Sequence, residues 1–123
     1  MEGLIVENNH QTNEAKEALL HYKHGMGVFE KHMPDVAHHF HQFTEVCFTE
    51  GKLTQKEKQL IALGISIVAQ DEYCMIYHTK GCLDQGATEE EVMEACGVAA
   101  AFGGGAALSQ AVTLIQESMR QLQ

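Results

Sequence analysis

The chain has 123 residues, a formal net charge of −9 at pH 7 and an apolar fraction of 45%. This length and composition predict one globular domain over residues 1–123. The negative charge excludes a general nucleic-acid binder, which needs a basic face to displace counterions. We also expect no membrane partner, because no run of 18 apolar residues occurs. The acidic first twenty residues do not resemble a signal peptide, so we expect a cytoplasmic protein.

The pattern along the chain is that of an all-α protein, because it has one proline, no Asn-Gly or Asp-Gly hairpin signal and little period-2 alternation. Residues 1–11 form a short polar lead. A first helix is predicted from about Asn13 to Lys31, with an apolar stripe formed by Ala15, Ala18, Leu19, Tyr22 and Met26. Pro34 suits the first turn of a second helix that ends near Phe48. Its inward-facing residues are predicted to be Val36, Phe40, Phe43 and Cys47.

Two capping boxes mark later helix starts. Thr54-Gln55-Lys56-Glu57 opens a third helix, which is apolar on most of its circumference and is predicted to be the central buried one. Asp71 is a predicted N-cap of a fourth helix that stops at Gly86. Thr88-Glu89-Glu90-Glu91 opens a fifth, which residues 103–105, three glycines, break or sharply bend. A last helix follows with predicted buried residues Ala107, Leu108, Ala111, Val112, Leu114 and Ile115, so the bundle has about six helices.

Cys74 and His78 stand four residues apart on the fourth predicted helix, and therefore on the same helix face. A histidine in that position can accept the thiol proton or hold the thiolate by charge, and the thiolate is the nucleophile. The helix N-terminus and a protonated His78 would lower the pKa of Cys74, whereas the like charge of Asp71 would raise it. The alternative is a small buried cysteine beside a helical histidine that bonds to a carbonyl group.

From Leu53 to about Ile115 the chain resembles the alkylhydroperoxidase D / carboxymuconolactone decarboxylase family. The resemblance rests on residues 53–54 (LT), 58–63 (KQLIAL), 72–74 (EYC), His78, 86–88 (GAT), Glu91 and 104–105 (GG). It implies a compact all-α fold that assembles as a homo-oligomer, a trimer or hexamer. Members of the redox branch carry a CxxC pair, a histidine four residues after the second cysteine, and a relay glutamate twelve residues before the first.

Matched to that pattern, Cys74 falls on the second cysteine, which attacks the peroxide, and His78 falls on the relay histidine. The place of the first cysteine holds Asp71, and the place of the relay glutamate holds Gln59. Asp71 cannot close a disulfide, so an oxidised Cys74 would stop at a sulfenic acid or form a mixed disulfide with an outside thiol. Gln59 cannot shuttle a proton, but it can orient His78 by a hydrogen bond.

The resemblance thus implies a thiol-dependent, peroxiredoxin-like oxidoreductase with antioxidant activity. Its catalytic residues would be Cys74, His78, Gln59 and Asp71, and its partners a small-molecule peroxide or carboxylate substrate and an external thiol reductant. No cofactor and no metal is expected. Two alternatives stay open: a decarboxylase-like lyase that uses His78 with Glu72 or Asp71, and a non-catalytic oligomeric member that has lost the CxxC chemistry.

The other cysteines and histidines have simpler interpretations. Cys82 lies about 12 Å from Cys74 along the helix axis, too far for a disulfide within one subunit, and Cys47, Cys82 and Cys96 are predicted to be core residues.

Two histidine pairs, 21 with 24 and 38 with 41, stand at i and i+3, a spacing that metal-binding helices use. Solvated or interface histidines are the preferred interpretation, because no HExxH motif accompanies them. Tyr73 and Tyr77 flank the cysteine and line either a pocket or a packing surface.

Overall fold

The computed structural model describes residues 13–123, and the predicted polar lead over residues 1–11 lies outside them. The described chain is all-helical, as predicted. The helices are α2 (Glu14–His32), α3 (Pro34–Phe48), α4 (Gln55–Ala69), α5 (Glu72–Asp84), α6 (Glu89–Gln110), a π-helical segment η1 (Ala111–Ile115) and α7 (Gln116–Leu122). The last three elements follow one another without a loop, but non-helical backbone at Gly104 divides the run into two helical stretches.

The predicted helix starts are confirmed by side chains that satisfy the first free backbone N–H groups. Pro34 occupies the first turn of α3, and the Asp71 carboxylate accepts a hydrogen bond from the backbone N–H of Cys74 at the start of α5. Thr54 and Thr88 each form a complete capping box, with Glu57 and Glu91 respectively. These starts therefore depend on residues within a single turn.

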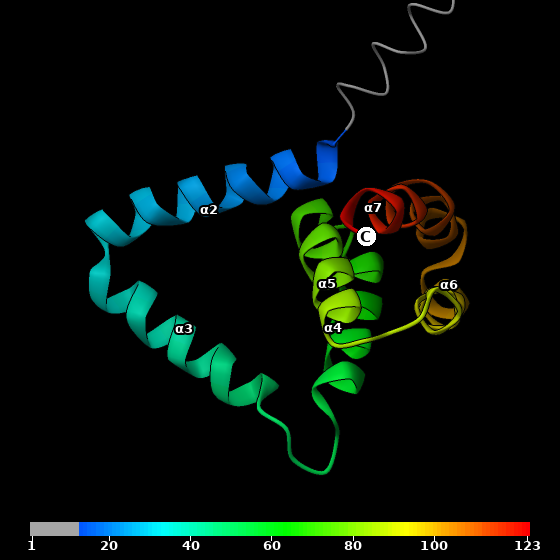
Figure 1. Ribbon diagram of the computed structural model, residues 1–123, viewed down its shortest axis with the longest axis horizontal. Coiled ribbons are helices and arrows are strands. Elements are labelled where there is room, and N and C mark those ends of the chain that lie inside the picture. The colour runs from blue at the N-terminus through cyan, green and yellow to red at the C-terminus, as the bar shows by residue number, and fades with distance from the viewer. Residues whose placement is uncertain (1–12) are drawn as a thin grey trace, which may run out of the picture.

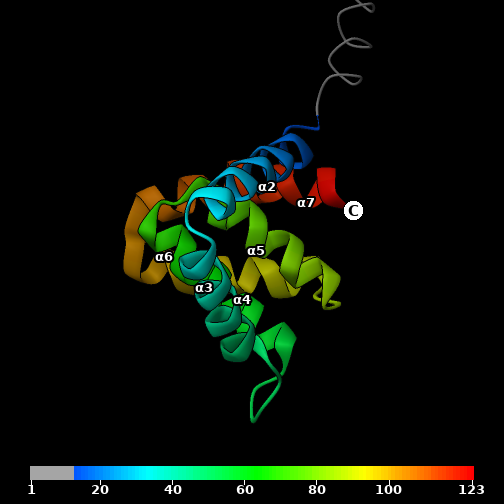
Figure 2. The same cartoon turned by 90° about the vertical axis from the view of Figure 1, so that its left-hand side faces the viewer.

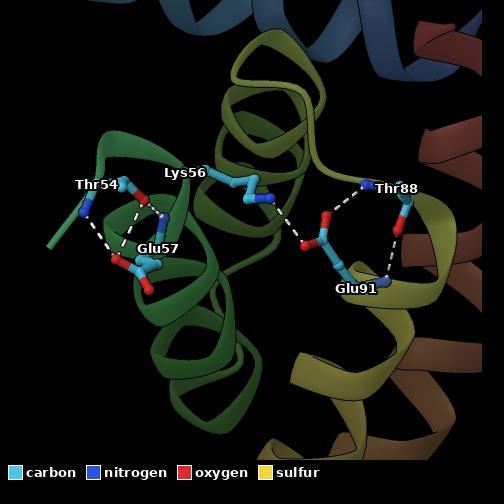
Figure 3. A network of polar contacts seen from close by, with 5 residues as sticks. All are labelled: Thr54, Lys56, Glu57, Thr88 and Glu91. Atoms are coloured by element: carbon cyan, nitrogen blue, oxygen red, sulfur yellow. Dashed lines mark hydrogen bonds and ion pairs between the residues drawn. The ribbon is translucent and has the colours of Figure 1, made fainter.

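One ion pair joins the two capping boxes (Figure 3). The Lys56 Nζ donates to Glu91 Oε2 at 2.9 Å, while Glu91 Oε1 accepts from the backbone N–H of Thr88 at 2.9 Å. Hydrogen bonding by Lys56 and by Thr88 holds the pKa of Glu91 below its usual value. The pair thus connects the N-terminal turn of α4 with that of α6.

A body made of α4, α5, α6, η1 and α7 contains the hydrophobic core, with α4 packed between α5 and α6 (Figures 1 and 2). The largest fully buried apolar side chains are Leu63, Ile67, Met75, Val92 and Ile115. Helix α4 is the central helix of the body, as predicted, but it is not buried on every side, because Ile61, Ile65 and Val68 leave one face exposed. Leu108 and Val112, predicted to be buried in the last helix, are also exposed.

The glycine triplet interrupts the helical run, as predicted, because the backbone at Gly104 is not helical. Gly104 has φ 69° and ψ −152°, a conformation that side chains with a Cβ rarely adopt. The whole run, Glu89–Leu122, is long and apolar enough to cross a membrane by length and composition alone. The core helix of a soluble protein meets the same criteria, and Val92, Cys96 and Ala99 do pack into the core here. The non-helical backbone at Gly104 divides the run into two helices, and both contribute residues to the core cluster, so we interpret the run as part of the body.

Helices α2 and α3 form an arm, and the two helices meet at a corner that lies away from the body (Figure 1). One end of the arm is fixed to α7, where the backbone N–H of Ala15 donates to Gln121 Oε1 at 2.8 Å. The other end is fixed to α4, where Lys58 Nζ donates to the carbonyl oxygen atoms of Cys47 and Thr49 at 2.9 and 2.6 Å. Between the two helices of the arm, His41 lies 3.3 Å from a carboxylate oxygen of Glu30.

The arm corrects the prediction for the second helix. The predicted inward face of α3, namely Val36, Phe40, Phe43 and Cys47, is exposed. Of the stripe predicted for α2, only Ala15 is buried. The pattern of apolar residues correctly indicates amphipathic helices, but α3 has little of the body to pack against, so most of its apolar side chains stay exposed.

Candidate functional site

A cavity of about 490 Å³ lies between the arm and the body, and it contains the predicted reactive pair. Cys74 and His78 line it from α5, and Gln59 lines it from α4. The remaining lining residues are Tyr22, Phe40, His41, Thr44, Glu45, Phe48, Tyr73 and Tyr77. The structure therefore brings three of the four predicted catalytic residues to one cavity, with Asp71 at its edge as the cap of α5.

Cys74 is exposed at the third position of α5, where its backbone N–H donates to Asp71 Oδ1 at 3.1 Å. Partial burial raises the pKa of the Cys74 thiol, and the negative charge of Asp71 and a hydrogen bond to it raise it further. The expectation that the helix N-terminus and a protonated His78 would lower this pKa is therefore not met. Asp71 fixes the helix start and at the same time disfavours the thiolate.

His78 is held on two sides. Its Nδ1 lies 2.9 Å from Gln59 Oε1, and because an amide oxygen only accepts, Nδ1 carries the proton. The Phe48 ring stacks on the imidazole with ring centroids 5.7 Å apart and an interplanar angle of 14°. Burial lowers the pKa of His78 below its usual 6.5, so the ring is neutral at neutral pH. His78 Nε2 then has a free lone pair and suits a base better than a cationic partner.

The Gln59–His78 hydrogen bond has the geometry that the sequence predicted, whereas its catalytic role stays a prediction. Within residues 13–123 the structure records no hydrogen bond between Cys74 and His78. The two side chains share a helix face and a cavity, and catalytic hydrogen bonds often tighten only once substrate binds.

Sequence reasoning missed the contribution of the arm to the cavity. Tyr22 from α2 lies near both tyrosines of α5 in tilted ring pairs, with ring centroids 6.2 Å from Tyr73 and 6.1 Å from Tyr77. His21 Nδ1 lies 2.7 Å from the hydroxyl oxygen of Tyr73. Burial and the neighbouring Tyr77 raise the pKa of Tyr22. Nothing in the sequence distinguishes Tyr22 from the other residues of its helical stripe, so only the position of the arm shows that it lines the Cys74 cavity.

The remaining cysteines divide into two classes. Cys82 and Cys96 are buried in the core, as predicted, and burial raises the pKa of their thiols to about 12 and about 11. Cys47 is exposed, so its prediction as a core residue is wrong. A reagent in solution therefore has two accessible thiols among the described residues, Cys47 and Cys74.

Neither carboxylate named for the lyase alternative, Glu72 or Asp71, lines the cavity that contains His78. Glu72 lines a different cavity, together with residues of η1 and α7, and the Asp71 carboxylate is occupied with capping α5. In the part of the chain that the structure describes, no cluster of three or more histidine, cysteine or carboxylate side chains is arranged to hold a metal ion.

Comparison with known proteins gives a consistent result. The model of the carboxymuconolactone decarboxylase family matches residues 34–117. A Paracoccus denitrificans protein known as uncharacterized protein 4 in cox locus is 42% identical over 72 residues, which are 58% of this chain and 65% of that protein. The match thus spans slightly less than two thirds of the relative's length.

Two solved structures share the fold. A carboxymuconolactone decarboxylase family protein from Legionella pneumophila, in its apo form, has a TM-score of 0.85 and 24% identity, covering 91% of this chain and 100% of its own. A family protein from Thermotoga maritima, for which involvement in an antioxidative response has been suggested, has a TM-score of 0.61 and 27% identity over 72% of each chain.

Proposed function

Because the chain belongs to the carboxymuconolactone decarboxylase family, we propose that it is a thiol-dependent oxidoreductase that reduces peroxides at Cys74. The observation that carries this proposal is the exposed Cys74 thiol in one cavity with a neutral, oriented His78. The antioxidative role suggested for the Thermotoga maritima protein adds weak support. The thiols of Cys82 and Cys96 are buried, and burial raises their pKa values.

The chemistry follows from the roles of the two side chains. His78 Nε2 accepts the proton of the Cys74 thiol, and the thiolate sulfur attacks one peroxide oxygen, forming an S–O bond while the O–O bond breaks. The leaving oxygen takes the proton back from His78, so an alcohol or water is released and Cys74 becomes a sulfenic acid. An external thiol then attacks the sulfur, water leaves, and a mixed disulfide forms. A second external thiol restores Cys74 and departs as a disulfide.

The raised pKa of Cys74 predicts a slow enzyme at neutral pH. Only the thiolate reacts, and the like charge of Asp71 keeps its population small. The rate of reaction with hydrogen peroxide is therefore expected to climb about tenfold per pH unit from pH 7 upward, without reaching a plateau below the usual thiol pKa.

The test uses the two exposed cysteines as a matched pair. Peroxide consumption with a small dithiol as reductant, and the appearance of a sulfenic acid by mass spectrometry, are expected in the parent and in Cys47→Ser but not in Cys74→Ser. If Cys74→Ser consumes peroxide as fast as Cys47→Ser, the proposal is wrong. Activity on a carboxylated lactone that survives thiol blocking but is lost in His78→Ala would support the lyase alternative instead. No turnover of either substrate would support the non-catalytic one.

We also propose that the chain functions as a homo-oligomer. A groove of about 650 Å³ between α4 and α6 is lined almost entirely by apolar groups, among them Ile61, Ile65, Val68 and Val98. Phe102 at its rim is 85% exposed. The arm carries a second exposed apolar surface. Apolar surfaces of this extent are rare on monomers, and a second copy of the chain that covers both is the simplest occupant.

Sedimentation analysis tests the assembly. The parent is expected to be a trimer or hexamer, Phe102→Glu is expected to dissociate it by placing a charge in the contact, and Phe102→Leu is expected to retain it. A monomeric parent at micromolar concentration would contradict the proposal.

We propose that the protein works in the cytoplasm. A reaction that consumes an external thiol needs a compartment that keeps thiols reduced, and the cytoplasm is such a compartment.

A further inference from the structure

Gly81 stands in the interior of α5, where glycine is a poor helix former compared with alanine. The backbone gives no reason for it. The described glycines with a positive φ are Gly86 and Gly104, so Gly81 has no conformation that alanine would resist. The reason for the missing Cβ must therefore lie in what occupies its space.

That space is filled by the carboxamide of Gln59. A Cβ built on Gly81 would lie 2.5 Å from Gln59 Cδ and 3.0 Å from Nε2, and closer still to Oε1. These three atoms are its nearest neighbours outside the local backbone, and carbon atoms in contact are normally about 3.5 to 4.0 Å apart. An alanine here could be accommodated only if the Gln59 amide moved.

The same amide oxygen is the partner of His78, which precedes Gly81 by three residues and so lies on the same face of α5. The amide thus rests against the bare backbone of Gly81 while its oxygen accepts from His78 Nδ1 at 2.9 Å. This contact keeps the proton on Nδ1 and leaves Nε2 free.

We propose that Gly81 is a positioning residue, whose missing side chain lets Gln59 hold His78 in the tautomer that can act as a base. The proposal concerns the same site as the proposed function and rests on that function only for its catalytic consequence. The tautomer itself is measurable whether or not the protein reduces peroxides.

The test measures the His78 tautomer by nitrogen-15 NMR and, separately, the rate of Cys74 alkylation, both in a Cys47→Ser background. Gly81→Ala is expected to shift His78 away from the Nδ1–H form and to slow alkylation roughly fivefold, the effect typical of losing one neutral hydrogen bond. Gln59→Ala is expected to do the same. Adding Gly81→Ala to Gln59→Ala is expected to change nothing further, because the atoms that the new Cβ would meet are gone.

Gly97→Ala is the matched control, since it lies inside α6 and a Cβ there meets nothing within 4 Å. It is expected to leave both readouts unchanged. Circular dichroism checks that the variants are folded, and the double variant removes the steric conflict if Gly81→Ala alone does not fold. The proposal is overturned if Gly81→Ala keeps the parent tautomer, or if it has the same effect with and without Gln59. A parent protein that shows the Nδ1–H tautomer and its expected shift in Gly81→Ala, but consumes no peroxide, would instead count against the proposed function alone.

Discussion

Replacing Asp71 by asparagine should make Cys74 more reactive at neutral pH. The asparagine side chain keeps an oxygen that can accept from the Cys74 backbone N–H, as Asp71 Oδ1 does at 3.1 Å. Asparagine and aspartate are about equally good N-caps, so α5 should still begin at the same place. The substitution therefore removes one negative charge beside the thiol and little else.

The size of the effect follows from Coulomb's law. Cys74 is exposed, so a water-like dielectric applies, and two unit charges about 4 Å apart then repel by about 1 kcal/mol. Removing that repulsion multiplies the thiolate population by about five. A less basic thiolate is also a weaker nucleophile, with a Brønsted coefficient of about 0.4 to 0.5, so the rate should rise only about two- to threefold. Burial still raises the pKa of Cys74, because it is the larger cause.

The assay is alkylation of Cys74 by a neutral iodoacetamide reagent from pH 7 to pH 10.5 in a Cys47→Ser background. Asp71→Asn should shift the rate profile toward lower pH with unchanged thermal stability. Asp71→Ala should shift it equally but lose about 1 kcal/mol of stability with the cap. An Asp71→Asn profile that superimposes on the parent's would refute the assignment of this charge as a cause of the raised pKa.

Three further predictions concern stability, each measured by urea denaturation at fixed protein concentration. Gly104→Ala should lower the free energy of unfolding by about 1 to 3 kcal/mol, because a φ of 69° strains a residue with a Cβ. The neighbouring Gly105→Ala should leave it unchanged, since a Cβ there meets nothing within 4 Å. Equal losses in the two variants would contradict this explanation. Thr88→Ala should lose about 1 kcal/mol with the cap of α6, and Thr88→Ser should retain it. Burial lowers the pKa of His78, so the imidazole binds a proton more readily in the unfolded chain than in the folded one. The free energy of unfolding should therefore fall as the pH drops below 6.5. His78→Gln should make this fall with pH less steep than in the parent.

The local signals in the sequence were sufficient for the helix starts. Asp71, Thr54 and Thr88 cap their helices because each side chain needs only a backbone N–H two or three residues away. Pro34 begins α3 for an equally local reason, its fixed φ. The spacing of Cys74 and His78 on one face of α5 belongs to the same class, since it follows from helix geometry alone.

The exposure of the apolar residues could not be predicted in this way. Phe43 and Val92 both lie on apolar helical faces, yet Val92 is fully buried and Phe43 is 65% exposed. The difference is that α6 packs against α4, whereas α3 lies in the arm. The direction in which the pKa of Cys74 is shifted was also not predictable, because burial of the thiol is its largest cause.

The sequence by itself thus determined where helices begin, that they are amphipathic, and that Cys74 and His78 match a family pattern from which Asp71 and Gln59 depart. Only the tertiary structure decided that Tyr22 and Phe48 line the cavity that contains the thiol, that Gly81 makes room for the Gln59 amide, and that α3 exposes its apolar face. The physical reason is one of range. Caps and helix faces depend on neighbours within a few residues, whereas burial and cavity walls depend on helices that meet from distant parts of the chain.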